Sequence, residues 1–287
     1  MTHYAHYVAH ARWDLCPFAD ELVAHWTWRR LRKGFPDALA VTLMPDHLHM
    51  VAPDLGDRGA KRLGRILGAA NRVSPRPALF RKVKPPRRLD SHDKLQRSVR
   101  YVWLNPCRPW TYRGREHQLT DDPLAWWWST LRDTVGAIAD PWIPAERVAV
   151  ALGWRNSSDA ARRLHAYATR DDHVSIAARA FPEPAAASEL PEGSIAEVFE
   201  AALHATRSPR GALRRKTKAR RVAVGLSYRQ GWTFPRRLAP RLDLHPTSIS
   251  RIARSVSPAA TEAAARCLAP RFRSPSPAER FIELGIA

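Results

Sequence analysis

Two histidines separated by one residue, His47 and His49, are the part of this sequence that most directly suggests chemistry. Side chains two positions apart on a β-strand point to the same face, so a strand here presents both imidazoles together and turns Leu48 and Met50 toward the core. Two imidazoles at that spacing can hold one divalent metal ion. A His-apolar-His pattern also arises by chance or for structural reasons in a chain with twelve histidines, so the pair alone does not establish a metal site.

A tyrosine and a carboxamide form the second candidate group. Residues 91–105 have the pattern of a helix, opened by a serine cap and closed before Pro106. On that helix Tyr101 and Asn105 are four residues apart and share a stripe. A phenol with a pKa near 10 is a weak nucleophile at neutral pH and needs help from its surroundings. The alternative interpretation is a half-buried tyrosine packed at a sheet edge.

Together, the two segments indicate a phosphoryl-transfer site. His47, His49 and Asn105 supply three metal ligands and leave open positions for phosphate oxygens. The metal would polarise the scissile phosphate and neutralise developing charge, while Tyr101 attacks. The product would be a covalent link between tyrosine and DNA phosphate, whose retained bond energy lets the strand be rejoined without ATP.

The elements that must position these groups follow from hydrophobic periodicity and turn residues. Strands are expected over residues 4–11, 38–43 and 47–52, and helices over 17–33, 61–71 and 91–105. We interpret residues 75–88 as a strand followed by an exposed basic loop. This order predicts an α+β sandwich with an antiparallel sheet. Residues 121–133 are expected to seal the edge of the domain with Trp126, Trp127 and Trp128.

The second half of the chain has a different character. Short helices are expected over residues 145–152 and 158–169, a linker rich in Ala, Pro and Glu over 182–191, and another helix over 195–205. Residues 207–221 contain eight basic residues and no acid.

Three further helices, over residues 222–228, 234–242 and 246–255, resemble a helix-turn-helix whose last helix enters the DNA major groove. A three-helix scaffold without DNA contact is the alternative. The predicted DNA-binding residues are Arg81, Lys82, Lys84, Arg87 and Arg88 near the catalytic groups, and Arg214, Arg215, Lys216, Lys218, Thr247, Ser248, Ser250 and Arg251 in the C-terminal region.

Composition agrees with a polyanionic partner. The 287 residues carry 47 Lys and Arg against 27 Asp and Glu, a formal net charge of +20, which favours nucleic acid or an anionic membrane surface. A surplus that only aids solubility, or a ribosome-associated protein, is the plainer interpretation.

No apolar run is long enough to span a membrane, no signal peptide is evident, and three widely spaced cysteines argue against a disulfide framework or a zinc finger. We therefore expect a cytoplasmic protein, in the bacterial cytosol or nucleoid.

Three short segments, taken in order, resemble the REP-associated tyrosine transposases, a group of the single-tyrosine HUH transposases. They are residues 44–49 (MPDHLH), 101–108 (YVWLNPCR) and 122–129 (DPLAWWWS). The resemblance covers about residues 1–133. Trp103 stands where the family is expected to carry histidine, and Trp127 stands in place of the proline of a Trp-Pro-Trp motif.

The resemblance implies a ferredoxin-like HUH nuclease fold with both histidines on a central strand. It implies Tyr101 as nucleophile, His47, His49 and Asn105 as ligands of Mg²⁺ or Mn²⁺, and single-stranded DNA with hairpin or palindromic repeats as substrate. Attack would leave a 5′-phosphotyrosine and a free 3′-hydroxyl.

The domain prediction is a nuclease domain over residues 1–135, a helical connector and linker over 136–192, and a helical DNA-binding region over 193–287 with the helix-turn-helix near 218–255. We expect a monomer or homodimer that cleaves in cis and anchors duplex DNA through the C-terminal region. The alternatives are a non-catalytic DNA-binding regulator that keeps the fold, and an HUH replication initiator or relaxase.

Overall fold

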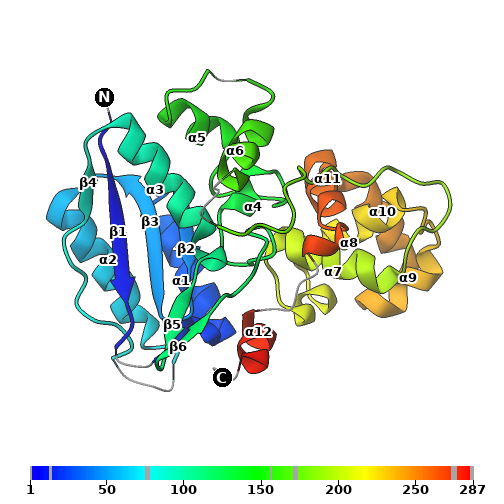
Figure 1. The fold of residues 1–287 in the computed structure, drawn as a ribbon. Coiled ribbons are helices and arrows are strands. Elements are labelled where there is room, and N and C mark those ends of the chain that lie inside the picture. Colours follow the sequence, from blue (N-terminus) through cyan, green and yellow to red (C-terminus); the bar gives the residue numbers. More distant parts are fainter. Residues whose placement is uncertain are drawn as a thin grey trace. The chain divides into compact units, whose positions relative to one another are not determined.

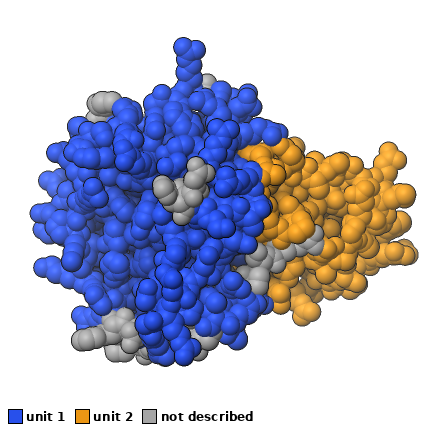
Figure 2. All heavy atoms as spheres, in the orientation of Figure 1, with its two compact units in different colours: residues 1–134, 142–179, 275–287 blue, residues 135–141, 180–274 orange. Residues whose placement is uncertain are grey.

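The structure, a computed structural model, describes residues 2–12, 15–74, 78–155, 157–170, 174–272 and 277–284. It is a mixed α+β protein, as predicted, with a four-stranded and a two-stranded antiparallel sheet and, within those residues, twelve α-helices (Figure 1). The chain folds into two compact units (Figure 2). Unit 1 comprises residues 1–134, 142–179 and 275–287, and unit 2 comprises residues 135–141 and 180–274.

The main sheet of unit 1 has the order β2-β3-β1-β4, and every neighbouring pair is antiparallel. Its strands are β1 (Tyr4–His10), β2 (Ala40–Leu43), β3 (His47–Pro53) and β4 (Arg87–Leu89). The three strands expected from the sequence are confirmed. For residues 75–88 we expected a strand and then an exposed basic loop. This order is wrong: the exposed basic loop comes first and β4 follows it. Residues 75–77 lie outside the described residues.

Two helices cover one face of this sheet and a third covers the other (Figure 1). On the first face, the Tyr7 ring lies 5.6 Å from the Phe35 ring at the end of α1 (Glu21–Gly34), and its hydroxyl lies against Gly59 of α2 (Gly56–Ala70). On the opposite face, the Thr42 hydroxyl donates a 2.7 Å hydrogen bond to the Val102 carbonyl of α3 (His92–Leu104). Because Thr42 is in register with His49, α3 covers the histidine-bearing face.

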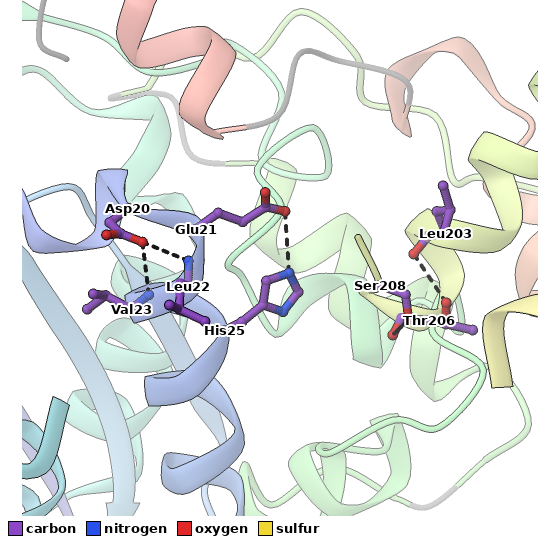
Figure 3. A network of polar contacts seen from close by, with 8 residues as sticks. All are labelled: Asp20, Glu21, Leu22, Val23, His25, Leu203, Thr206 and Ser208. Carbon is purple, nitrogen blue, oxygen red and sulfur yellow. Dashed lines mark hydrogen bonds and ion pairs between the residues drawn. The ribbon is translucent and has the colours of Figure 1, made fainter. Parts of the chain in front are cut away.

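Capping residues set where the helices begin. The side chain of Asp20 accepts hydrogen bonds from the N–H groups of Leu22 and Val23, at 2.8 and 3.2 Å (Figure 3). The cap separates α1 from a 3₁₀ turn, η1 (Pro17–Ala19), so the single helix expected over residues 17–33 is two elements. The expected cap of α3 is confirmed, since Ser91 Oγ accepts from Lys94 N at 3.2 Å.

The hairpin β5 (Trp110–Tyr112) and β6 (Arg115–His117) was not expected from the sequence. Its turn residues Arg113 and Gly114 both have positive φ, 49° and 75°, as a two-residue hairpin turn requires. The tryptophan segment seals the edge of the sheet as predicted: Leu43 N donates to Trp128 O at 3.0 Å, and Trp126 Nε1 donates to Leu43 O at 2.8 Å. The remaining helices of unit 1 are α4 (Leu131–Thr134), α5 (Ala145–Ala151), α6 (Ala160–Thr169) and α12 (Pro277–Glu283).

Unit 2 is helical among its described residues. Its α-helices are α7 (Ile195–Thr206), α8 (Lys218–Arg229), α9 (Pro235–Leu242), α10 (Pro246–Ser255) and α11 (Pro258–Arg266), with the 3₁₀ turns η3 (Arg210–Arg214) and η4 (Pro270–Phe272). A capping box of Ser194 and Glu197 opens α7. At its other end the Thr206 hydroxyl donates to the Leu203 carbonyl at 3.3 Å (Figure 3), before Arg207 turns into the left-handed region at φ 46°.

The segment expected as a linker, residues 182–191, is hydrogen-bonded to the end of α8. Ser188 N donates to Arg229 O and Gln230 Nε2 donates to Ala186 O, both at 2.9 Å. The segment therefore packs within unit 2. The functional domain boundaries near residues 135 and 192 stay a prediction.

Candidate active site

His47 and His49 project from one face of β3, as predicted, and α3 covers that face. Leu48 and Met50 are fully buried on the opposite face. His49 sits in the centre of the sheet, opposite Val8 on one side and Thr42 on the other, and is only 7% exposed. The two imidazole centroids lie 4.9 Å apart with nearly perpendicular rings, so both point into one space above the sheet.

Asp46 fixes the protonation pattern of His47. Its Oδ1 atom lies 2.6 Å from His47 Nδ1 and accepts a second hydrogen bond, 2.9 Å long, from Trp110 Nε1. A carboxylate can only accept, so His47 Nδ1 carries a proton, and in the neutral form of the ring Nε2 keeps a lone pair. This is the arrangement that orients a metal-ligating histidine, and it explains what the β5–β6 hairpin contributes to the site.

Asn105 faces that lone pair. It follows the last residue of α3, in the 3₁₀ turn η2 (Asn105–Cys107), and is 6% exposed. Its Oδ1 atom lies 3.3 Å from His47 Nε2. If Nε2 is protonated it donates a hydrogen bond to Oδ1, and if Nε2 keeps its lone pair the two acceptors can share a metal ion. The structure thus brings together the carboxamide and the imidazole predicted as ligands.

Tyr101 stands one helical turn before Asn105 and is accessible, with 38% of its surface exposed. Its ring meets the His49 ring edge-on at 5.2 Å. The guanidinium of Arg108 lies over the same ring, 5.2 Å from its centroid. The phenol, the histidines and a permanent positive charge therefore converge within one unit, where an approaching phosphate could meet all of them.

Two further histidines on β1 join the site. His6 Nε2 lies 3.0 Å from His49 Nδ1, and the His6 ring is 6.0 Å from that of Tyr101. The His10 ring is 5.4 Å from the His47 ring, because His10 pairs with His47 in the antiparallel register. These two residues, with Asp46, Arg108 and Trp110, were not predicted as site residues. The signal for His6 and His10 was the alternation of β1, which places Tyr4, His6 and Val8 on one face.

Burial keeps these imidazoles neutral. It lowers the pKa of His6 to about 4, with a smaller contribution from the positive charge of Arg87. Burial also lowers the pKa of His49 well below its usual value, and the neighbouring histidines add to the effect. The pKa of His10 is lowered mainly by burial. Only a neutral imidazole can ligate a metal, and His49 is in that form.

The donor set fits a divalent cation held by few protein ligands. Among the described residues, no three His, Cys, Asp or Glu side chains are grouped so that they could hold a metal ion. The candidate set is instead two imidazole nitrogens and one amide oxygen, His47, His49 and Asn105. Such a set is incomplete for an octahedral ion and leaves positions for water or phosphate oxygens.

The predicted DNA-binding residues of unit 1 are exposed. Arg81, Lys82 and Lys84 lie on the loop before β4, while Arg87 and Arg88 belong to β4 itself. Arg88 Nε is 3.0 Å from Asp54 Oδ2, so part of its charge is already paired.

The predicted residues of unit 2 lie on two neighbouring elements. Arg214, Arg215 and Lys216 are exposed around the end of η3, and Lys218, the first residue of α8, lies 3.9 Å from Asp140. On α10, described in full, Ile249 is the one buried residue. Thr247 and Arg251 are exposed as expected, but Ser248 and Ser250 are partly buried, because they flank Ile249 where α10 packs against α8 and α9.

Comparison with protein-family models, with curated proteins and with solved structures finds no match to this chain. No helix among the described residues has the length and apolar character needed to cross a membrane.

Proposed function

We propose that this protein is a metal-dependent single-stranded DNA endonuclease and strand transferase of the single-tyrosine HUH transposase type, with Tyr101 as the nucleophile. The observation that carries the proposal is the 3.3 Å approach of His47 Nε2 to Asn105 Oδ1, with Tyr101 one helical turn away against His49. A protein that only binds DNA has no need for an imidazole nitrogen and a carboxamide oxygen that face each other beside an accessible phenol.

The topology of unit 1 supports a ferredoxin-like HUH fold. The order strand-helix-strand-strand-helix-strand, with the antiparallel arrangement β2-β3-β1-β4, is the order of that fold. The paired histidines lie on β3, which is a central strand. α3 then crosses the open face and carries the tyrosine.

The proposed reaction is a transesterification. The Tyr101 oxygen forms a bond to the phosphorus of the target strand, and the bond from that phosphorus to the 3′-oxygen breaks. The phenolic proton is lost to water, and the leaving oxygen takes up a proton to become a 3′-hydroxyl. The 5′-phosphate stays on tyrosine, and a returning 3′-hydroxyl reverses the step and joins a strand. Arg108 is positioned to attract the phosphate and to offset the charge that develops on it.

His47, His49 and Asn105 would hold Mg²⁺ or Mn²⁺. When bound, the cation neutralises charge on the scissile phosphate and polarises it. Asp46 keeps the Nε2 lone pair of His47 directed toward Asn105. Because the set contains two nitrogens, we expect it to bind Mn²⁺ more tightly than Mg²⁺, which prefers oxygen ligands.

We propose that unit 2 binds duplex DNA beside the repeat. α10 has a single buried anchor and an outer face with Thr247 and Arg251, the geometry of a helix that enters a major groove. Arg214, Arg215 and Lys216 add phosphate-binding charge near the start of α8. This surface is also what favours the second candidate function, a DNA-binding regulator without catalysis.

The decisive experiment traps the covalent intermediate. The full chain is incubated with single-stranded DNA that carries hairpin repeats and a label at its 3′ end, downstream of the cleavage site, with Mn²⁺ or with EDTA, and run on a denaturing protein gel. We expect a labelled protein band with Mn²⁺ that is lost in Tyr101→Phe and kept in the matched control Tyr228→Phe, which changes a tyrosine of unit 2. Tight binding of duplex DNA without any labelled band over varied repeats would favour the regulator.

A mixing experiment tests catalysis in cis. Tyr101 and the histidines of the same chain already converge, so we expect each chain to cleave with its own tyrosine and its own histidines. His47→Ala and Tyr101→Phe proteins should each be inactive, and a mixture of them should stay inactive. Recovery of the labelled band on mixing would show that two chains share a site.

A further inference from the structure

An open cleft of about 620 Å³ lies in unit 1 between α2 and the basic loop before β4. One wall is a single face of α2, which includes Lys61, Gly64 and Gly68, and the other is formed by residues 80–85. None of the catalytic groups lines it, so the cleft is distinct from the histidine site.

The rim of the cleft is cationic. Arg12, Lys61, Arg81 and Lys82 line it, against the single carboxylate of Asp57. All four cations are exposed. Arg12 is held in place by a 3.2 Å hydrogen bond from its Nε to the Phe80 carbonyl. The surplus of positive charge, carried by Arg12, Arg81 and Lys82 opposite the α2 wall, suits an anionic ligand that lies in the cleft.

The floor of the cleft is apolar, and two glycines leave part of it without side chains. It includes Leu67 and Phe80, which are mostly buried. Gly64 and Gly68 leave the α2 backbone open there. A Cβ atom added to Gly68 would meet no described atom within 4 Å, and one added to Gly64 would meet only Val83, at 3.8 Å.

A third glycine of the same helix gives the contrast. A Cβ atom on Gly59 would lie 2.3 Å from the Tyr7 hydroxyl, so close packing requires glycine at that position. No such packing requires Gly64 or Gly68 among the described residues, although alanine is a better helix former. Glycine at these two positions keeps a flat backbone surface that a ligand can approach closely.

The cleft is joined to the strand that carries His10. Arg81 N donates to the His10 carbonyl at 2.9 Å, and Arg12 N donates to the Leu79 carbonyl at 2.8 Å. The His10 ring in turn lies 5.4 Å from that of His47. A polymer that leaves the histidine site past the end of β1 would therefore meet the cationic rim next.

We propose that this cleft holds a nucleotide of the single-stranded DNA that flanks the scissile phosphate. Its base lies over Phe80 and the glycine face of α2, and its phosphates meet Lys61, Arg81 and Lys82. The proposal rests on the proposed function, since it takes single-stranded DNA as the substrate. A flat apolar floor below a cationic rim matches a nucleotide, which has an aromatic face and a charged backbone.

The test compares affinities in full-length protein that carries Tyr101→Phe, so that binding is measured without cleavage. Gly68→Leu fills the cleft from an exposed position and replaces glycine with a better helix former. Lys61→Ala removes one cation of the rim, and Arg65→Ala removes an exposed cation of the same helix outside the cleft. Fluorescence anisotropy is recorded in EDTA with a labelled hairpin that has a single-stranded tail and with the same hairpin made blunt.

We expect Gly68→Leu and Lys61→Ala each to weaken binding of the tailed hairpin by about tenfold, the usual effect of losing one stacked base or its phosphate contacts. Arg65→Ala should bind it like the parent, and the blunt hairpin should bind all four proteins alike. Equal affinity of Gly68→Leu and the parent for the tailed hairpin would overturn the cleft assignment. The labelled-band experiment, run with Tyr101 intact, tests the proposed function separately. If the cleft variants bind the tailed hairpin normally and still form the band, only the assignment of the cleft is contradicted.

Discussion

His6 Nε2 lies 3.0 Å from His49 Nδ1, a contact between two strands that lie side by side in the sheet. Both rings are neutral, because burial lowers the pKa of each. If His49 is to ligate through Nε2, its Nδ1 carries the proton and donates a hydrogen bond to His6 Nε2. His6 then does for His49 what Asp46 does for His47, so each candidate ligand has a partner that sets its tautomer.

Replacing His6 should therefore weaken metal binding. We expect His6→Phe to lower the affinity for Mn²⁺ by about 10- to 100-fold, the usual cost of losing an outer-shell partner. Free Mn²⁺ is counted by electron paramagnetic resonance during a titration of the protein without DNA. His3→Phe changes an exposed histidine near the same strand and should leave the affinity unchanged. Unaltered binding in His6→Phe would mean that His49 is oriented by other means.

Replacing Arg108 should slow the chemical step more than it affects metal binding. The guanidinium lies over the Tyr101 ring, where it can offset charge on the phosphate under attack. We expect Arg108→Gln to slow formation of the labelled band by about tenfold or more and Arg108→Lys to restore part of the rate. Because Arg108 has other partners in the fold, the melting temperature of each variant is measured alongside, and a rate that falls only with stability would argue for a structural role.

The free energy of unfolding should fall as the solution is acidified. His6 has a folded pKa of about 4, below the value near 6.5 of an unfolded histidine. Between these two values the unfolded chain binds a proton that the folded chain does not, so stability is full above about pH 6.5 and is lost as the pH falls toward 4. The cost from His6 alone is about 3 kcal/mol over that interval. Urea unfolding at several pH values in EDTA measures it, and His6→Phe should flatten the curve.

Duplex binding by unit 2 should depend on Arg251. Arg251→Ala removes an exposed charge of α10, and we expect weaker binding of duplex DNA. The slope of the logarithm of the binding constant against the logarithm of the salt concentration should fall by about one, the loss of one phosphate contact. Arg170→Ala, which lowers the net charge equally on an exposed position of unit 1, is the matched control. If both variants bind alike over a range of salt, the effect is one of net charge and α10 does not dock.

The sequence by itself determined where the strand β3 and the helix α3 lie and which polar side chains each presents on one face. The spacing of His47 and His49 on a strand, and of Tyr101 and Asn105 on a helix, follows from the 2.0 and 3.6 periodicities of single elements. Such local patterns are read without knowing the fold, and the strand β3 and the helix α3 lie where they predict. The helices α9 and α10 were located in the same way.

Only the tertiary structure decided which residues share the site. His6 belongs to it because β1 pairs with β3, and Trp110 because a hairpin with positive φ at Arg113 carries it to Asp46. Gly64 and Gly68 look like weak points of a helix until the loop before β4 makes them one wall of a cleft. Contacts of this kind join residues distant in sequence, and they depend on strand register and packing, which no local periodicity encodes.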